Sequence, residues 1–137
     1  MKLLATLLLC VFTCLAATAQ QSDPAVPART AVVELTEKYQ LTETQQVRMQ
    51  EIQTRYYTDL ARLAKLENAD AAYYIKKRQA LQSGTQGSIR LLLDKEQLKT
   101  FDQERRLLRS RRAELVQALT KAGKSELEIQ RALLDVE

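Results

Sequence analysis

No proline occurs after Pro27, so residues 28–137 form one proline-free stretch. Proline lacks a backbone N–H and breaks helices from within, and its absence leaves a long chain free to stay helical. The same stretch is rich in Ala, Leu, Gln, Glu, Lys and Arg, which are strong helix formers. It shows no sustained alternation of apolar and polar residues, the pattern of a half-buried strand. The sequence therefore predicts an all-α fold of long amphipathic helices, in one domain over residues 29–137.

Local signals divide this stretch into helices and turns. From apolar residues at three- and four-residue steps, the expected helices cover residues 29–39, 42–67, 71–92 and 94–121, with a short helix after residue 125. Asp70 is the predicted N-cap of the third helix. Gly123 has the position of a C-cap glycine, and Ser125 with Glu128 has the spacing of a capping box.

The expected helix over residues 71–92 contains two glycines, Gly84 and Gly87. They could break the helix, or they could lie on one face where another backbone comes close. Each glycine inside a helix costs about 1 kcal/mol relative to alanine, so a continuous helix needs a packing reason. We favour a continuous but weak helix.

The first nineteen residues have the three-part plan of a secretory signal peptide. A short basic start precedes an apolar run over residues 3–15, which is too short to span a bilayer, and residues 17–19 form a small-x-small cleavage site. We expect cleavage before Gln20. The polar residues 20–28 are then expected to be a flexible leader, because they carry both prolines of the chain.

Both cysteines, Cys10 and Cys14, lie in the predicted signal peptide and would be removed with it. An alternative is a lipid-modified N-terminus at Cys14, for which Phe12 and Thr13 are poor preceding residues. No other stretch is apolar enough for a membrane helix. We expect an exported chain without disulfides and without stable membrane insertion.

Missing residue types exclude most catalytic chemistry. The chain has no histidine, and without its two cysteines it lacks the side chains of ordinary zinc, copper or nickel sites. It has no base for a Ser-His triad, and its three glycines form no phosphate-binding loop. The formal net charge of +4 is mild and does not suggest nucleic acid as a partner. We expect a protein that is not an enzyme and uses no cofactor or metal.

A short motif occurs twice, as LTETQ at residues 41–45 and as LDKEQ at residues 93–97. Each copy has the spacing of a capping box, in which the N-cap side chain and a glutamine three residues later bond each other's backbone N–H. Each box stabilises a corner by about 1 kcal/mol. The motif residues are Leu41, Thr42 and Gln45 in the first copy and Leu93, Asp94 and Gln97 in the second. The motif therefore predicts two similar corners, each opening a long helix.

Behind a signal peptide, this motif pair resembles the Spy/CpxP family of periplasmic LTxxQ proteins over roughly residues 29–119. The first copy matches the motif fully. In the second, Asp94 replaces the threonine, and both copies lack the proline that often follows it. Aspartate caps a helix as well as threonine, so the corner is kept.

The resemblance implies a thin cradle of helical hairpins, coiled-coil-like in character, that forms a homodimer in the periplasm. It also implies a stress-response function, because the best-known members of the family are ATP-independent chaperones that hold unfolded envelope proteins. Other members of the family damp an envelope-stress sensor by binding its folded domain. A metal-sensing branch relies on histidine, which this chain lacks. A structural helical protein without clients is a third possibility.

The densest cluster of charge, residues 104–114, holds five arginines among leucines. Such a mixed stripe suits loose binding of acidic, partly unfolded chains through long-range attraction and then apolar contact. The candidate client-binding residues are Arg105, Arg106, Arg109, Arg112, Leu108, Phe101, Met49, Ile52 and Tyr56. Alternatively, Arg105 and Arg112 pair with nearby acidic residues or cover the edge of the core.

Two tyrosine pairs, Tyr56–Tyr57 and Tyr73–Tyr74, lie in the expected second and third helices. Neighbouring residues of a helix point about 100 degrees apart. We expect one ring of each pair in the core and the other near the surface, with core and boundary packing favoured over client contact.

Overall fold

The computed structural model describes residues 23–136. The predicted signal peptide, its cleavage site, Cys10 and Cys14 lie outside the described residues. Within residues 23–136 there are five α-helices, one 3₁₀ turn and no strand, which confirms the all-α prediction. The elements in chain order are α1 (Ala25–Tyr39), α2 (Glu43–Leu63), the 3₁₀ turn η1 (Ala64–Leu66), α3 (Ala71–Leu92), α4 (Lys95–Lys121) and α5 (Glu126–Leu133).

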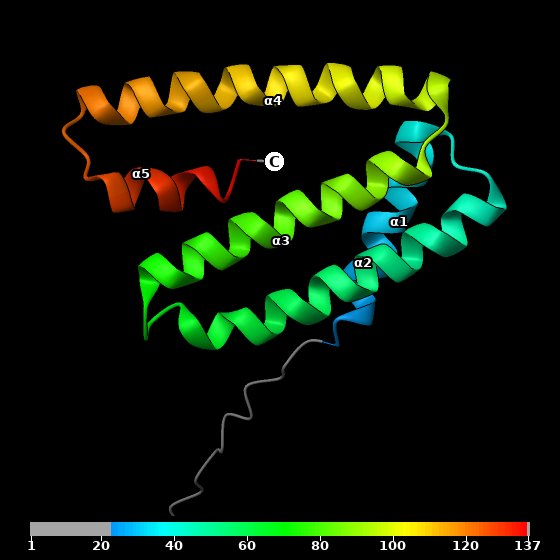
Figure 1. Ribbon diagram of the computed structural model, residues 1–137, viewed down its shortest axis with the longest axis horizontal. Coiled ribbons are helices and arrows are strands. Elements are labelled where there is room, and N and C mark those ends of the chain that lie inside the picture. Colours follow the sequence, from blue (N-terminus) through cyan, green and yellow to red (C-terminus); the bar gives the residue numbers. More distant parts are fainter. Residues whose placement is uncertain (1–22, 137) are drawn as a thin grey trace, which may run out of the picture.

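The helices form an open arrangement around the α2–α3 pair (Figure 1). α3 runs back alongside α2, and α1 crosses the pair at the end where α2 begins and α3 ends. α4 is the longest helix and leaves that same end in a new direction. α5 turns back beneath α4, so that the end of the chain lies between α4 and α3.

The predicted helix caps all form. Side chains of the N-cap residues accept a hydrogen bond from the backbone N–H three residues later at Thr42, Asp70, Asp94 and Ser125. In three of these caps the reciprocal bond of a capping box is also present. At the end of α4, Gly123 has φ +71°, and the next residue donates to the Leu119 carbonyl, which closes the helix.

Helix α1 begins at Ala25, four residues earlier than expected, so the prediction of a flexible leader is wrong for residues 25–28. Pro27 lies in the first turn, where backbone N–H groups have no partner within the helix and proline loses nothing. The Ala25 N–H is instead bonded by Asp23 at 3.0 Å. The second helix, α2, ends at Leu63 and is followed directly by η1, which ends at Leu66, one residue before the expected helix end at residue 67.

The core consists of two separate clusters. The larger one forms where the two motif corners meet, and its buried members are Val32, Tyr39, Leu41, Met49, Ile89, Leu93 and Phe101. The smaller one lies at the far end of the α2–α3 pair and contains Tyr74, Ile75 and Leu134. The leucine that starts each motif is therefore anchored in the larger core, which fixes both corners in place.

Helix α3 is continuous through Gly84 and Gly87, as expected. The expected packing reason is absent, because a methyl group added at either position would meet no atom within 4 Å among the described residues. Both glycines are exposed to solvent. They therefore cost helix stability without a compensating contact in the described chain.

Replacing Gly84 and Gly87 by alanine is expected to raise the free energy of unfolding by about 1 kcal/mol at each position, because alanine has the higher helix propensity and space is free. Gly123→Ala is the matched control and should have the opposite sign, since its backbone is left-handed. Urea denaturation followed by circular dichroism measures all three. A loss of stability at position 84 or 87 would contradict the open packing of this face.

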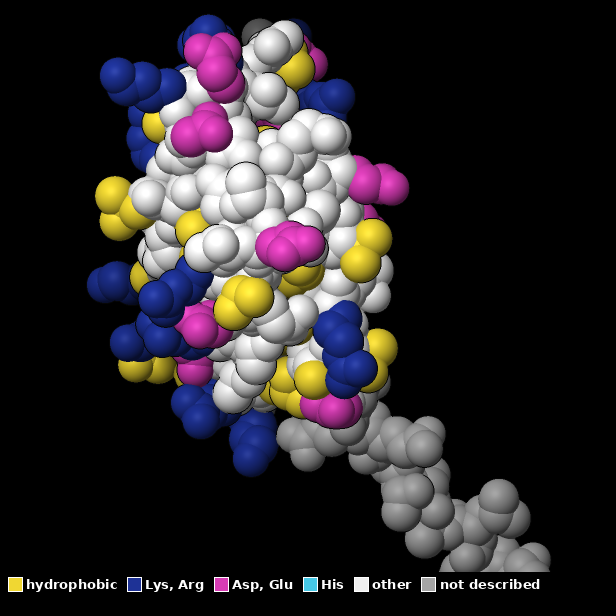
Figure 2. Space-filling model, turned by 90° about the vertical axis from the view of Figure 1, so that its right-hand side faces the viewer, with side chains coloured by type: hydrophobic (Ala, Val, Ile, Leu, Met, Phe, Trp, Pro, Cys, Tyr) yellow, Lys and Arg dark blue, Asp and Glu magenta, His cyan; other side chains and the backbone are white. Residues whose placement is uncertain are grey.

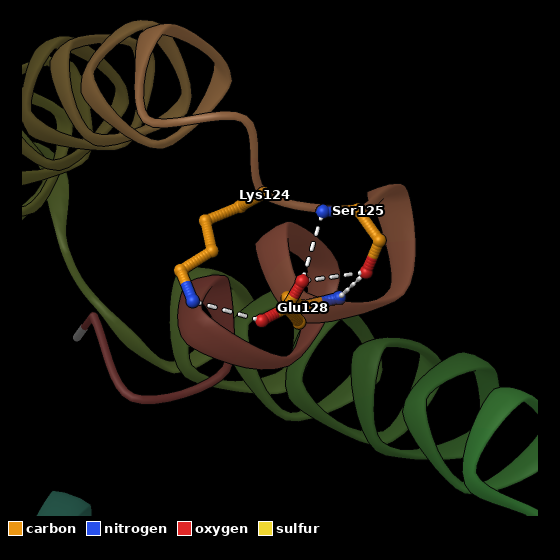
Figure 3. Close-up of polar contacts among 3 residues, drawn as sticks. All are labelled: Lys124, Ser125 and Glu128. Atoms are coloured by element: carbon orange, nitrogen blue, oxygen red, sulfur yellow. Dashed lines mark hydrogen bonds and ion pairs between the residues drawn. The ribbon is translucent and has the colours of Figure 1, made fainter.

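Glu128 is held in the capping box that opens α5 (Figure 3). Its carboxylate accepts from the Ser125 N–H at 2.9 Å, from Lys124 at 3.0 Å and from the Ser125 hydroxyl at 2.8 Å. These bonds, the Ser125 backbone bond first, lower the pKa of Glu128 from 4.5 to about 2. The charged carboxylate is therefore the form that α5 requires.

The start of α5 is expected to weaken in acid. A lowered pKa means that the stabilisation is present above about pH 4.5 and is lost as the pH falls toward about 2. The free energies of unfolding of the parent and of Glu128→Gln should therefore differ at pH 6 and converge in that window. Glu126→Gln, in the same turn, is the control for charge alone. A constant difference across the pH range would show that this carboxylate does not cap α5.

Candidate functional site

The two motif corners meet through their glutamines, which the sequence did not predict. The Gln45 side-chain N–H donates to Gln97 Oε1 at 2.7 Å, and the Gln97 side-chain N–H donates to Gln45 Oε1 at 2.9 Å. Gln45 Oε1 also accepts the backbone N–H of its own N-cap, Thr42, and Gln97 Oε1 accepts that of Asp94. Each glutamine thus closes its own capping box and binds the other one.

The second N–H of each glutamine side chain is used as well. Gln45 donates to the Leu92 carbonyl at 3.0 Å, and Gln97 donates to the Gln40 carbonyl at 3.3 Å. Each acceptor is the residue just before the leucine of the other motif, so the two halves bind each other in the same way. We call this arrangement the glutamine joint: the side chains of Gln45 and Gln97 with the carbonyls of Gln40 and Leu92.

The signal for the joint is the choice of glutamine at both positions. Glutamate would close a capping box equally well, because that bond needs only an oxygen acceptor. Of these two side chains, only the glutamine amide can accept the backbone N–H and also donate to a partner at neutral pH. The joint therefore explains why both motifs end in glutamine, and its task is to hold α1, α2, α3 and α4 in one arrangement.

Beside the joint lies an open groove of about 510 Å³, to which α1, α2, α3 and α4 all contribute. Its volume is in the range of sites that bind small ligands or short chain segments. The lining residues that matter for its chemistry are Leu35, Tyr39, Tyr56, Tyr57, Gln82, Phe101, Arg105, Leu107, Leu108 and Arg111. The groove therefore combines apolar and aromatic surface with three cationic side chains, Lys38, Arg105 and Arg111, and two carboxylates, Glu34 and Glu104.

Arg105 is half-buried in this groove and has no hydrogen bond or ion pair to any residue within 23–136. Burial lowers the pKa of its guanidinium, and the positive charges of Arg112 and Arg109 lower it further. A half-buried cation among other cations is an unfavourable arrangement that an anion would relieve.

The acidic residues near Arg105 are bound elsewhere. Glu104 accepts the Tyr39 hydroxyl at 2.5 Å and pairs with Lys38 at 3.2 Å, which joins α4 to α1. Burial and this carboxylate raise the pKa of Tyr39. Asp102 pairs with Arg90 of α3. The alternative in which nearby acids neutralise Arg105 is therefore wrong.

The structure brings three of the candidate client-binding residues together as partly exposed groove residues, Arg105, Leu108 and Tyr56, while Phe101 borders the groove from the larger core and is only 6% exposed. Met49 is fully buried in the larger core and cannot contact a client, and Ile52 is partly buried against that core and does not line the groove. The helical stripe identified both as apolar, but spacing alone cannot separate a core side chain from a groove side chain.

The other arginines have different surroundings. Arg112 donates to the Leu133 carbonyl at 2.7 Å and so holds the end of α5. Arg106 and Arg109 are exposed and do not line the groove. Arg111 does line it, although the sequence did not select it. The different surroundings of these arginines depend on where α1 and α5 lie against α4.

The first tyrosine pair corrects the expectation of one core ring and one surface ring. Tyr56 and Tyr57 are both half-buried, both line the groove, and pack edge to face with ring centroids 5.1 Å apart. For the second pair the expectation is confirmed, since Tyr74 is buried and Tyr73 is exposed. The groove is therefore richer in aromatic surface than the sequence predicted.

The side of the molecule seen in Figure 2 has no broad apolar surface. Lys and Arg side chains gather along one edge of this face, and hydrophobic side chains occur in small groups. Within residues 23–136, no helix is both long and apolar enough to cross a membrane. Comparisons of the chain with protein-family models, with curated proteins and with solved structures give no match.

Proposed function

We propose that the protein is an exported, ATP-independent holdase that binds acidic, partly unfolded chains in the groove. The observation that carries this proposal is Arg105, a half-buried arginine without an ionic partner among the described residues, in a groove of tyrosine and leucine side chains. An acidic side chain of a client would neutralise Arg105, and neighbouring apolar residues of the client would cover the rings.

The shape of the groove favours loose binding over a tight fit. It is partly open to solvent and is lined by four helices, so a short chain segment can enter without a fixed shape. Tyrosine offers large contact area at low conformational cost, and arginine stacks on aromatic groups as well as pairing with acids. Such a surface suits many weak clients.

The resemblance of the motif pair to the Spy/CpxP family supports the same proposal and adds a periplasmic location and a homodimer to it. The glutamine joint gives this motif a physical purpose, because it fixes the four helices that line the groove. A regulator of an envelope-stress sensor would differ by binding one folded domain at a fixed stoichiometry.

The proposal is tested with purified residues 20–137 and two unrelated denatured proteins, which are diluted into buffer without ATP while light scattering is recorded. We expect aggregation of both to be suppressed, and the suppression to weaken as salt is raised, because attraction between exposed charges is screened. No suppression at several-fold excess would overturn the proposal. A complex with only one folded envelope domain would favour the regulator instead.

A further inference from the structure

The C-terminal segment lies between α3 and α4 (Figure 1). Arg112 of α4 donates to the Leu133 carbonyl at 2.7 Å, and Gln82 of α3 donates to the Leu134 carbonyl at 3.3 Å. Gln79 of α3 also donates to the side chain of Gln130 at 2.7 Å. Residues 130–134 are thus held by hydrogen bonds from α4 on one side and from α3 on the other.

The surface beneath this segment is apolar. Leu134 is only 1% exposed and forms the smaller core cluster with Tyr74 and Ile75, and Leu63 and Leu66 pack around it. Since Leu134 is the one member of that cluster from the C-terminal segment, removal of the segment would expose the others. α5 and the residues after it therefore cover a patch that an apolar chain could bind.

This covered patch continues the groove. Gln82 lines the groove and also bonds the Leu134 carbonyl, so the same side chain belongs to both. On α4, Arg105 lies in the groove and Arg112, two turns later on the same face, lies under the C-terminal segment. The groove is therefore shorter than the surface that α3 and α4 provide.

The C-terminal segment is an imperfect occupant. Arg112 and Gln82 contact backbone carbonyls, which every polypeptide carries. The buried Nε of Arg112 and of Arg78 have no partner among the described residues, and Arg78 reaches Asp135 only at 3.9 Å. A carboxylate at either arginine would accept the N–H group that α5 leaves unused.

We propose that α5 is a displaceable plug, and that a partner segment with adjacent leucines followed by an acidic residue takes its place. This inference rests on the proposed function in one respect, namely that the partner is an unfolded client. The short connection through Gly123 allows α5 to leave without disturbing α4, which ends at Lys121. The bound segment would extend from the groove past Gln82 to the end where α2 stops at Leu63 and α3 begins at Ala71.

Because α5 is covalently attached to the same chain, it competes strongly with a free partner segment for the surface it covers. A segment on a short linker has an effective local concentration of the order of millimolar. A partner at micromolar concentration therefore competes poorly with α5, and weakening α5 should increase the apparent affinity of the partner.

The test uses the full mature chain and needs no client. The probe is a fluorescein-labelled peptide of residues 125–136, and its binding is measured by anisotropy. Leu134→Asp releases the plug, with Leu134→Ala as a milder form in case the first variant unfolds, and circular dichroism checks folding. A short bis-maleimide between cysteines in Gln79→Cys/Gln130→Cys locks the plug, because the two side chains touch.

We expect the release variant to bind the peptide about tenfold more tightly than the parent, and the locked form to bind none. A folded release variant without binding, or equal binding by the locked form, would overturn the inference. The same proteins are then compared in the light-scattering assay. Better protection by the release variant ties the plug to holdase activity, whereas equal protection by locked and released forms shows that clients do not use this surface. If the parent protects nothing, the holdase proposal fails and the peptide result still decides the plug.

Discussion

Replacing Gln97 by glutamate is expected to lower the free energy of unfolding by about 3 kcal/mol at pH 7. The Gln97 side chain is 9% exposed and donates two hydrogen bonds, to Gln45 and to the Gln40 carbonyl. A carboxylate donates none. It would keep the bond to the Asp94 N–H, but its second oxygen would face two carbonyl oxygens in a buried site.

The pH dependence distinguishes this cause from a general loss of packing. Burial and the facing oxygens raise the pKa of the introduced carboxylate above its value in the unfolded chain. The deficit should therefore shrink as the pH falls and the group becomes protonated, since a carboxylic acid can again donate one bond. Urea denaturation at pH 7 and pH 5 measures this effect.

The control is Gln103→Glu, which makes the same change of charge at an exposed position of α4. It should change the free energy of unfolding by less than about 0.5 kcal/mol. Gln45→Glu, the other side of the joint, should behave like Gln97→Glu. Equal and small effects at all three positions would show that the glutamine joint does not stabilise the fold.

Arg105→Glu is expected to abolish most client protection while helicity stays unchanged. The reversal removes the cation that an acidic client would bind and adds repulsion in its place, so the concentration needed for half-protection should rise about tenfold. The fold should be kept, because Arg105 makes no bond that holds α4 to a described residue. Light scattering with an acidic denatured client is the measurement.

Arg106→Glu is the matched control, one residue along the same helix, exposed and outside the groove. It changes the net charge by the same amount, so any effect of overall charge appears in both variants. Protection lost equally in both would assign binding to general attraction by the basic side of α4. Protection kept in both would remove Arg105 from the proposed site.

The helix boundaries were largely predictable because their signals are local. A capping box spans four residues, and its chemistry needs nothing from the rest of the chain, so Thr42, Asp94 and Ser125 could each be placed from sequence. Pro27 misled because proline is compatible with a first helical turn as well as with a leader. A proline at this position looks the same in the sequence whether it belongs to a leader or to the first turn of a helix.

Contacts between distant segments could not be predicted in this way. Gln45 and Gln97 are 52 residues apart, and each already had a sufficient local explanation as a cap. Arg105 and Arg112 lie seven residues apart, on the same face of α4. Even so, Arg105 lines the groove, whereas Arg112 binds the C-terminal segment. Their difference depends on where α1 and α5 lie, which helical periodicity does not specify.

The glutamine joint also restricts how this sequence can diverge over generations. A change at Gln45 leaves Gln97 without its partner, and the reverse is equally true, so a tolerated replacement has to arise at both positions together. The motif at residues 41–45 and the motif at residues 93–97 are therefore expected to change together. Relatives of this protein should keep the two glutamines, or lose them, as a pair.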